Sequence, residues 1–286
     1  MPKNYGISIL ITGSKGYIGS RLRDYLIAQK YKVRGLDIKT GTDICDYSSL
    51  EKHFELYRPD FVIHCAAQIG RLWGEEQPGA MLRTNILGTL NVVKLCSKYK
   101  IKLINFATSE VCFPAQNIYG ISKVAAEDIV SHYTQNYGLK AVSIRPFMIY
   151  GPGIHPSKYR SALDQFVAAA LRDKALDVHK GTIRSWLHIN DFIKAIEMII
   201  EKDEFISGML EVYDIGSDDY RSMESVARKI VKQVGRGRLN LIDAPSFLTL
   251  EKKWNFSYIK LLGWKPTITL EKGLVELIKW HKTLLK

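Results

Sequence analysis

The sequence predicts an α/β fold in which a doubly wound parallel sheet is joined to a smaller, mixed α/β lobe. Short apolar runs alternate with amphipathic stretches over the first 150 residues, and a glycine-rich turn joins the first run to the first stretch. The alternation stops after Gly151-Pro152-Gly153. Such alternation is typical of parallel strands joined by right-handed helical crossovers, with ligands bound at the carboxyl ends of the strands.

Hydrophobic spacing predicts the elements of the first half of the chain. Five runs rich in Ile, Val, Leu and Phe have the length of strands, namely Ile7–Thr12, Lys32–Asp37, Phe61–Cys65, Lys102–Ala107 and Ala141–Arg145. Four stretches between them have helical periodicity, namely Tyr17–Gln29, Ser48–Tyr57, Met81–Tyr99 and Ser122–Tyr137. We therefore expect residues 1–150 to form one domain, to which later segments return.

The second half of the chain has a mixed pattern without an internal repeat. Helices are expected at Ser161–Asp173, Asp191–Glu201, Ser222–Val234 and Leu270–Leu285. Short strands are expected at Leu176–His179 and Met209–Ile215. We expect residues 151–286 to form mainly a smaller lobe that packs against the first domain and closes a cleft.

The composition excludes several other classes of protein. The chain has 286 residues, 46% hydrophobic and 24% charged, so it can bury a sizeable core, and it has no apolar run long enough to span a membrane. Its first residues lack the parts of a signal peptide. The four cysteines, at positions 45, 65, 96 and 112, do not have metal-ligand spacing. We therefore expect a soluble cytoplasmic protein with reduced thiols, without a metal ion and without a membrane partner.

The formal net charge of +12 is compatible with nucleic acid, an anionic surface or an anionic small molecule as partner. The lysines are spread along the whole chain rather than gathered in one block. This distribution favours a solvated basic surface and no nucleic-acid partner. A basic cleft for a diphosphate ligand fits the same charge, because it needs only a few of these residues.

A glycine-rich loop with the spacing G-x-x-G-x-x-G joins the first predicted strand to the first predicted helix. Gly13 permits a tight turn, Gly16 lets the backbone approach a pyrophosphate, and Gly19 lets the helix pack close to the sheet. The free amides at the start of the helix, at Tyr17 and Ile18, would bind the anion. Because the loop follows a strand and precedes an amphipathic helix, it indicates a Rossmann-like dinucleotide-binding domain.

Asp37 ends the second predicted strand, 18 residues after Gly19. A carboxylate at this place can accept a hydrogen bond from a ribose 2′-hydroxyl, which favours NAD; the alternative is an Asp that caps a helix or a turn. Arg34 and Lys39 could hold a 2′-phosphate, so NADP stays open as the cofactor. Further residues expected along the cofactor, where small side chains could also serve only core packing, are Ile38, Asp43, Ile44, Ala66, Ala67 and Gln68.

Tyr119 is the only tyrosine of fifteen that is followed by a lysine four residues later, Lys123. On a helix these two side chains share one face, and a lysine ammonium favours the phenolate, so we expect it to lower the pKa of Tyr119. Tyr119 could then take a proton from a substrate hydroxyl as hydride leaves, or return it in the reverse reaction. Thr108, Ser109 and Glu110 follow the strand 102–107 and would point at the same ligand. Thr108 could donate a hydrogen bond to the reacting oxygen, or it could cap a helix. Glu110 could be a second acid or base, or a solvated loop residue.

Taken in order, the motifs of the chain resemble one family of enzymes, the extended short-chain dehydrogenase/reductases. The resemblance is to their branch of NAD-dependent epimerases and dehydratases that act on nucleotide sugars. It spans nearly the whole chain and rests on the glycine loop, Ala66-Ala67, Thr108-Ser109-Glu110-Val111, Tyr119-x-x-x-Lys123, Arg145-Pro146-x-x-x-Tyr150-Gly151-Pro152, Arg184-Ser185-Trp186-x-x-Ile189-x-Asp191 and Leu262-Gly263-Trp264-Lys265-Pro266.

The resemblance implies roles for the matching residues. Thr108, Tyr119 and Lys123 would be the catalytic residues, and Lys123 would also hold the nicotinamide ribose. Asn85 and Pro146 would lie near the cofactor. Arg184 would bind a phosphate of a nucleotide-diphosphate sugar, although it could be an ordinary surface ion-pair residue. Helices 81–99 and 122–137 would form the interface of a homodimer. Residues expected at the substrate are Thr108, Ser109, Glu110, Met148 and Arg184.

The chain departs from the family pattern at several places. The segment between Asp37 and Asp43 is short, and only ten residues separate Thr108 from Tyr119. Many relatives have Val-Tyr-Gly where this chain has Val111-Cys112-Phe113, and an Asn that touches substrate where it has Met148. Ser109 disfavours 4,6-dehydration, for which the family uses an aspartate there.

The leading hypothesis from the sequence is a nucleotide-sugar epimerase, which oxidises the sugar at C4 and then reduces it from the other face. The alternative is a 4-keto-sugar reductase, which the short loop before Tyr119 favours. A decarboxylase remains possible, because Thr-Ser-Glu also occurs in that branch. A non-catalytic, nucleic-acid-binding member is less favoured, because binding needs no Thr108, Tyr119 and Lys123.

Overall fold

The computed structural model describes residues 6–112, 117–154, 161–245, 250–251 and 254–285. The chain divides into two compact units. The first unit comprises Met1–Pro146 and Ala195–Tyr213, and the second comprises Phe147–Lys194 and Asp214–Lys286. Each unit has its own sheet elements and its own apolar core, and they are described in turn.

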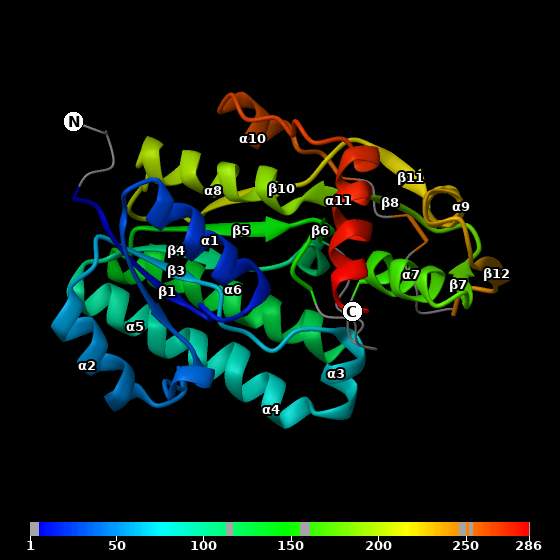
Figure 1. Ribbon diagram of the computed structural model, residues 1–286. Helices are drawn as coiled ribbons and strands as arrows, with labels where there is room; N and C mark the ends of the chain where they lie inside the picture. Colours follow the sequence, from blue (N-terminus) through cyan, green and yellow to red (C-terminus); the bar gives the residue numbers. More distant parts are fainter. Residues whose placement is uncertain (1–5, 113–116, 155–160, 246–249, 252–253, 286) are drawn as a thin grey trace. The chain divides into compact units, whose positions relative to one another are not determined.

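The first unit is built on a parallel sheet whose strands alternate with helices (Figure 1). The strand order is β2-β1-β3-β4-β5-β10, with parallel register from β2 through to β5. The order reverses at β1, so the carboxyl end of β1 is a switch point of the kind at which α/β sheets bind ligands. The strands are β1 (Ser8–Thr12), β2 (Lys32–Leu36), β3 (Phe61–His64), β4 (Lys102–Phe106), β5 (Ala141–Pro146) and β10 (Glu211–Ile215). The predicted doubly wound α/β fold is confirmed.

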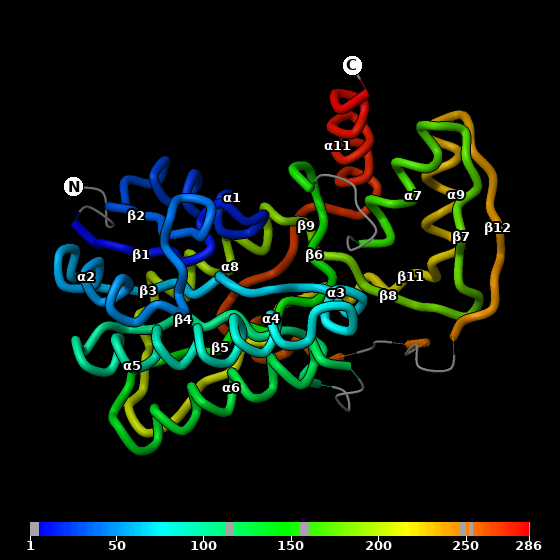
Figure 2. Tube along the Cα trace, turned by 90° about the horizontal axis from the view of Figure 1, so that it is seen from below, coloured from blue at the N-terminus to red at the C-terminus, as the bar shows by residue number. Residues whose placement is uncertain are grey.

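Helices cover both faces of this sheet. Leu10, Val62 and Leu103 of neighbouring strands are fully buried in one cluster with side chains of α2 (Tyr47–Tyr57), α5 (Thr89–Tyr99) and α6 (Ile118–Tyr137). The last two of these helices run side by side (Figures 1 and 2). Because side chains alternate along a strand, Ile9 and Ile11 face the other side. There α1 (Tyr17–Ala28) meets α8 (Ile189–Lys202) through a hydrogen bond of 2.6 Å from the Tyr25 hydroxyl to Glu197.

Two predicted helices differ from the observed ones at their starts. The helix predicted at 81–99 begins earlier, at Pro78, and consists of α4 (Pro78–Leu82), a π-helical segment η2 (Arg83–Gly88) and α5. The helix predicted at 122–137 begins at Ile118, because the Asn117 side chain accepts a hydrogen bond from the Gly120 amide and so caps the first turn. Three short elements were not predicted, namely η1 (Ile38–Thr40), α3 (Arg71–Glu76) and η3 (Ser109–Cys112).

The second unit combines helices with three two-stranded pairs. Strand β6 pairs with β9 and β7 with β12, both in parallel, while β8 pairs with β11 in antiparallel register. Five of these strands were not predicted, because most have only two or three residues and β12 is largely exposed. The elements are β6 (Ile149–Tyr150), α7 (Ala162–Leu171), β7 (Ala175–His179), β8 (Ile183–Ser185), β9 (Leu187–His188), β11 (Tyr220–Ser222), α9 (Met223–Val234), β12 (Arg238–Ile242), α10 (Ser257–Leu261) and α11 (Leu270–Thr283).

Asp191, at the start of α8, joins two of the sequence motifs within the second unit. Its side chain is 1% exposed and accepts hydrogen bonds of 2.7–2.8 Å from the Thr267 amide, the Thr267 hydroxyl and the Ile268 amide. Its carbonyl oxygen accepts a further bond of 3.2 Å from the Trp264 indole. One buried carboxylate therefore fixes the Leu262–Pro266 motif and the chain that follows it.

The substitution Asp191→Asn is expected to lower the free energy of unfolding by about 2–3 kcal/mol, because one acceptor oxygen becomes a donor facing buried donors. Urea unfolding followed by circular dichroism measures this change. The matched control is Asp177→Asn, because Asp177 is exposed and accepts a surface bond from Asn240; it is expected to stay within about 0.5 kcal/mol of the parent. Equal effects of the two substitutions would contradict the role assigned to Asp191.

Candidate active site

The glycine loop after β1 is packed too tightly for side chains. Gly13 has φ +70°, and a Cβ there would lie 2.6 Å from the Ala66 backbone nitrogen. A Cβ on Gly19 would lie 2.2 Å from the carbonyl oxygen of Gly13, so the start of α1 sits directly on the loop. The Gly16 amide closes the turn with a bond of 3.0 Å to the same oxygen. The structure thus gives steric reasons for glycine at positions 13 and 19.

The amino end of α1 has no side-chain cap. The residue before the helix, Gly16, has no side chain to offer, and the first helical residues are Tyr17 and Ile18. The first amides of a helix have no partner within it, and together with the helix dipole they form a site for an anion. The crowded glycines and the uncapped helix therefore fit the pyrophosphate of a dinucleotide.

Asp37 follows β2 and ties the glycine loop to that strand. Its carboxylate is 8% exposed and accepts from the Lys15 amide at 2.8 Å and from the Lys39 amide at 2.9 Å. Asp37 is thus the cap of the short turn that contains Ile38, the alternative considered for it from the sequence. Each carboxylate oxygen can accept a second bond, so a ribose hydroxyl on Asp37 remains a prediction.

Asp43 and Ile44 lie between that turn and α2. The Asp43 carboxylate accepts from the Cys45 amide at 2.9 Å and from the Arg83 guanidinium at 3.1 Å. Burial alone would raise the pKa of Asp43, but these bonds and the charge of Arg83 together lower it. Ile44 is 6% exposed and packs against Gly88 of η2, so its side chain belongs to the core.

Asn85 holds the segment that follows β3. Its side chain accepts from the Gln68 amide at 2.8 Å and donates to the Gln68 carbonyl oxygen at 2.9 Å. The same amide nitrogen donates to the Ser122 hydroxyl of α6 at 2.9 Å. Asn85 lies within the π-helical segment η2, a helix type often found at functional sites. This arrangement fixes the backbone of Ala66, Ala67 and Gln68 next to the glycine loop.

His64, a residue that the sequence analysis did not single out, completes this network. Its Nδ1 lies 2.7 Å from the Thr12 hydroxyl, and its Nε2 lies 3.1 Å from the Thr89 hydroxyl. Thr89 donates its proton to the Asn85 carbonyl oxygen at 2.6 Å, so Nε2 of His64 must carry the proton that it shares with Thr89. Burial lowers the pKa of His64 to about 3, and the ring stays neutral. The sequence signal that could have identified His64 is a single histidine at the end of an otherwise apolar strand.

Thr108, Tyr119 and Lys123 lie in the same unit, on the carboxyl side of β4 and in the first turns of α6. Thr108 is 7% exposed, Lys123 is 5% exposed, and Tyr119 is partly exposed. Burial of the Tyr119 hydroxyl raises its pKa to about 12, against a lowering effect of the hydrogen bond from Thr108. The lowered pKa expected for Tyr119 is therefore wrong for this structure, because burial outweighs the favourable contacts.

Lys123 is held by the backbone of β4. Its ammonium donates to the carbonyl oxygen of Phe106. Burial lowers the pKa of Lys123 to about 8, against the raising effects of Cys65 and Glu127, so the ammonium form predominates at neutral pH. The predicted cation is thus present beside the sheet end, fixed by a backbone oxygen.

Glu110 is not a solvated loop residue. Its carboxylate forms an ion pair with Arg71 of α3, with Nη2 at 2.5 Å and Nε at 3.0 Å, and its side chain is 16% exposed. Ser109, which precedes it, is buried at 6% exposure. Of the predicted motif Val111-Cys112-Phe113, Phe113 lies outside the described residues. Arg71 was not predicted, since no motif marks it.

Pro146 ends β5, and the two other predicted substrate residues belong to the second unit. Arg184 is 7% exposed, and so is buried rather than at the surface, and it donates to the carbonyl oxygens of Ile183 and Leu250, each at 2.7 Å. Met148 has φ +46°, a left-handed conformation that is strained for a residue with a side chain. That these residues meet the substrate remains a prediction.

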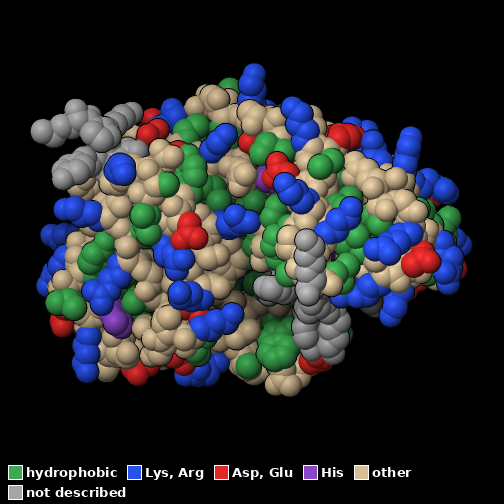
Figure 3. Space-filling view, viewed as in Figure 1, with side chains coloured by type: hydrophobic (Ala, Val, Ile, Leu, Met, Phe, Trp, Pro, Cys, Tyr) green, Lys and Arg blue, Asp and Glu red, His purple; other side chains and the backbone are tan. Residues whose placement is uncertain are grey.

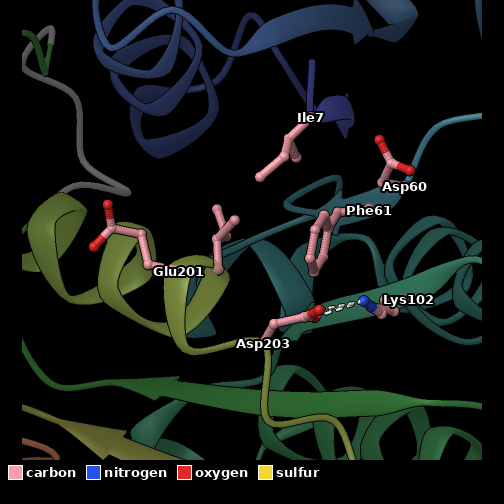
Figure 4. Close-up of a pocket in the computed structure, with 7 residues that line it drawn as sticks. Ile7, Asp60, Phe61, Lys102, Glu201 and Asp203 are labelled. Carbon is pink, nitrogen blue, oxygen red and sulfur yellow. Dashed lines mark hydrogen bonds and ion pairs between the residues drawn. The ribbon is translucent and has the colours of Figure 1, made fainter. Parts of the chain in front are cut away.

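A pocket of about 300 Å³ lies at the amino ends of the strands in the first unit, opposite the end that carries the glycine loop (Figure 4). It is lined by Phe61 and Lys102 at the amino ends of β3 and β4, and by residues near the end of α8. Lys102 is paired with Asp203 at 2.6 Å, and Asp60 accepts from the Ser8 amide and hydroxyl. The glycine loop and Thr108 follow the carboxyl ends of strands, so this pocket is separate from the candidate site.

The described part of the chain shows no group of three or more side chains placed to hold a metal ion. Within the same residues, no helix is both long and apolar enough to cross a bilayer. The four cysteines are free thiols. Lysine and arginine side chains are scattered over the face seen in Figure 3 rather than gathered in one patch, as their distribution in the sequence suggests.

Comparison with known proteins identifies the family. The sequence model of the NAD dependent epimerase/dehydratase family matches residues 9–216. A UDP-N-acetyl-alpha-D-glucosaminuronate decarboxylase of Bacillus cytotoxicus is 28% identical over 324 residues, which cover 96% of this chain and 98% of that protein. A dTDP-D-glucose 4,6-dehydratase of Dictyostelium discoideum is 26% identical over 361 residues, covering 96% of this chain and 81% of that protein.

A solved structure supports the same assignment. The UDP-glucuronic acid 4-epimerase of Bacillus cereus, in complex with UDP-glucuronic acid and NAD, superposes with a TM-score of 0.86 at 25% identity. The superposition covers 97% of this chain and 100% of the epimerase chain. The resemblance inferred from the sequence motifs is confirmed, and the chain belongs to the NAD-dependent epimerase/dehydratase family.

Proposed function

We propose that this protein is an NAD-dependent nucleotide-sugar 4-epimerase. The observation that carries the proposal is the buried ammonium of Lys123, held on the Phe106 carbonyl oxygen one turn after Tyr119, in the unit that also contains Thr108 and the glycine loop. Relatives of known structure support NAD as cofactor and a nucleotide sugar as substrate. The first unit would hold NAD, and the second, through Arg184, a phosphate of the nucleotide.

The residues at the site fit both halves of an epimerisation. NAD, held by the glycine loop and the first amides of α1, would supply reversible hydride transfer at C4. Tyr119, as phenolate, takes the proton of the C4 hydroxyl and gives it back to the keto oxygen. Thr108 would donate to that same oxygen and so stabilise the phenolate. Lys123 contributes positive charge, and a bound cationic nicotinamide ring would favour the phenolate further.

Two observations favour epimerisation over the other activities of the relatives. Ser109 offers no carboxyl group to protonate a leaving hydroxyl, which disfavours 4,6-dehydration. Glu110 shares its carboxylate with Arg71 at 2.5–3.0 Å, which disfavours its use as a free base in dehydration or decarboxylation. Neither observation limits a reaction in which Tyr119 alone moves the proton.

The proposal also includes a homodimer formed through helices 81–99 and 122–137. Leu87 and Ile121, in and just before these segments, are 42% and 45% exposed. Large apolar side chains at such exposure on helices that already lie together are compatible with burial by a second copy. Sedimentation of the purified protein at micromolar concentration measures the mass and tests this part separately.

The test of the activity starts from the purified protein and any nicotinamide released from it by denaturation. The protein is then incubated with UDP-glucose, UDP-glucuronic acid or dTDP-glucose, and the products are followed by proton NMR. The expected result is retained NAD and a C4 epimer, without net change of absorbance at the nicotinamide band. Consumption of added NADPH with a 4-keto sugar would replace the proposal by the reductase, and release of carbon dioxide by the decarboxylase. Salt-dependent RNA binding without any turnover would overturn it as an enzyme.

A further inference from the structure

Helix α3, which no sequence motif marks, contacts Tyr119 and the chain that precedes it. It lies between the segment fixed by Asn85 and the start of α4. Three of its residues, Arg71, Gly74 and Glu75, meet η3 or the first turn of α6. Arg71 and Glu75 are four residues apart and therefore share one face of the helix. These contacts are all within the first unit.

The Arg71 contact fixes the chain before Tyr119. Both Nε and Nη2 of its guanidinium donate to the same oxygen of Glu110, at 3.0 and 2.5 Å. The two side chains are 29% and 16% exposed, so the pair is only partly screened by water. Glu110 lies two residues after Thr108, whose hydroxyl accepts a bond of 3.4 Å from the Glu110 amide. Arg71 thus anchors the turn that presents Thr108 to Tyr119.

The Glu75 contact fixes the chain immediately before Tyr119. Its Oε1 accepts a hydrogen bond of 2.9 Å from the amide of Ile118, the first residue of α6. The Asn117 side chain accepts from another amide of this first turn, that of Gly120, at 2.9 Å. A carboxylate at this end of a helix is also favoured by the helix dipole. The first turn of α6, which carries Tyr119, is therefore held by a side chain from another helix as well as its own.

Gly74 allows the close approach of α3 to α6. A Cβ at this position would lie 3.2 Å from the backbone nitrogen of Tyr119 and 2.9 Å from the Met81 sulfur. Gly74 is buried within the helix. Helix α3 is thus packed directly on the backbone of Tyr119, and Arg71 and Glu75 bind Glu110 and Ile118 in the chain that precedes it.

We propose that Arg71 and Glu75 are positioning residues for Tyr119: Arg71 holds Glu110 and neutralises its charge, while Glu75 anchors the first turn of α6. The proposal rests on the proposed function for its consequence in catalysis, but not for the contacts themselves. It assigns to α3 the task of keeping the Tyr119 phenol at a fixed distance from Thr108.

The charges around Tyr119 give the proposal a measurable consequence. Thr108 and Glu110 act directly on the phenol. Arg71 pairs with Glu110, and Glu75 accepts from the Ile118 amide. Lys123, one turn further along α6, faces His64, Cys65 and Glu127. Burial is the main cause of the raised pKa of Tyr119, and the negative charge of Glu110 raises it further. Without Arg71, that negative charge would act on the phenol uncompensated, and deprotonation would require a higher pH.

The first measurement needs neither substrate nor cofactor. Hydrogen–deuterium exchange is compared in the parent, Arg71→Ala, Glu75→Ala and Lys98→Ala, the last removing a similar ion pair of 2.6 Å between Lys98 of α5 and Glu51 of α2. Glu75→Ala is expected to speed exchange over residues 117–123 at least about tenfold, and Arg71→Ala over 109–112, at unchanged global stability. Exchange equal to that of Lys98→Ala in both segments would overturn the proposal, whatever the protein catalyses.

The second measurement separates positioning from a merely structural role. In the pH profile of turnover, the limb that reports deprotonation of Tyr119 is expected to move up by about one pH unit in Arg71→Ala. The limb should move to lower pH in Glu110→Gln. It should return to the parental pH in the double variant Arg71→Ala/Glu110→Gln, and stay there in Arg71→Lys. A limb that does not move in any variant would overturn the charge argument. Absence of turnover in the parent would refute the proposed function instead, and the exchange data would still decide on α3.

Discussion

The substitution Tyr119→Phe is expected to lower turnover by at least about 100-fold, the scale of acid–base catalysis, while NAD affinity stays nearly intact. Phenylalanine keeps the ring but removes the only atom that can carry the proton to and from the sugar oxygen. Thr108 cannot replace it, because an unassisted hydroxyl is a far weaker acid. Turnover is measured by NMR of the sugar epimers, and NAD affinity by calorimetric titration.

The matched control for this variant is Tyr133→Phe. Tyr133 lies on the same helix, is also partly exposed, and stacks on Tyr137 with ring centroids 4.7 Å apart. Loss of its hydroxyl is expected to change neither turnover nor affinity. Turnover of Tyr119→Phe within about tenfold of the parent would remove Tyr119 from the reaction, and with it the proposed mechanism.

The sheet of the first unit could be predicted from sequence because each strand is a compact apolar run. The four residues of β3, Phe61 to His64, are all buried, so the strand can be predicted without knowledge of the strands beside it. The second unit gave weaker signals. Strands such as β6 and β9 have two residues each and exist only because they pair with each other. A strand of two residues is too short to show the alternation of apolar and polar residues from which strands are predicted.

The cofactor loop was predictable for a related reason, since local steric constraints require its glycines. The spacing of Gly13, Gly16 and Gly19 already implied the close packing that the structure shows. By contrast, the His64 network depends on Thr12, Thr89 and Asn85, which come from separate elements. Its geometry follows from the register of β1 and β3 and from the π-helical turn, neither of which leaves a motif.

The pKa of Tyr119 shows where reasoning from neighbours in the sequence fails. Spacing alone places Lys123 one turn away and suggests a lowered value. The structure places that ammonium on the Phe106 carbonyl and brings Glu110 to the phenol from another segment. Burial, which only the tertiary structure determines, then dominates. The same dependence on tertiary contacts hid α3, whose role rests on Arg71 and Glu75 meeting residues about 40 positions away (roughly the length of a βαβ crossover).

The substitution Gly13→Val is expected to abolish measurable NAD binding. Valine would have to adopt φ +70°, and its Cβ would lie 2.6 Å from the Ala66 nitrogen, so the loop must move away from the segment after β3. That movement displaces the Gly16 turn and the free amides of α1 from the position a pyrophosphate needs. We also expect a loss of at least about 3 kcal/mol in the free energy of unfolding, since a strained, β-branched residue and a backbone clash act together.

Two further variants separate the parts of this effect. Gly181 also has φ +70°, but nothing lies within 4 Å of its Cβ position, so Gly181→Val carries the backbone strain without the clash. It should lower stability by about 1–2 kcal/mol and leave NAD affinity unchanged. Gly16→Ala meets only the Gly13 oxygen, at 3.1 Å, and should fold while binding NAD at least about tenfold more weakly. Calorimetric titration and urea unfolding measure both quantities. Parental NAD affinity in folded Gly13→Val would place the dinucleotide elsewhere, because the valine and the loop conformation that leads into α1 cannot occupy the same space.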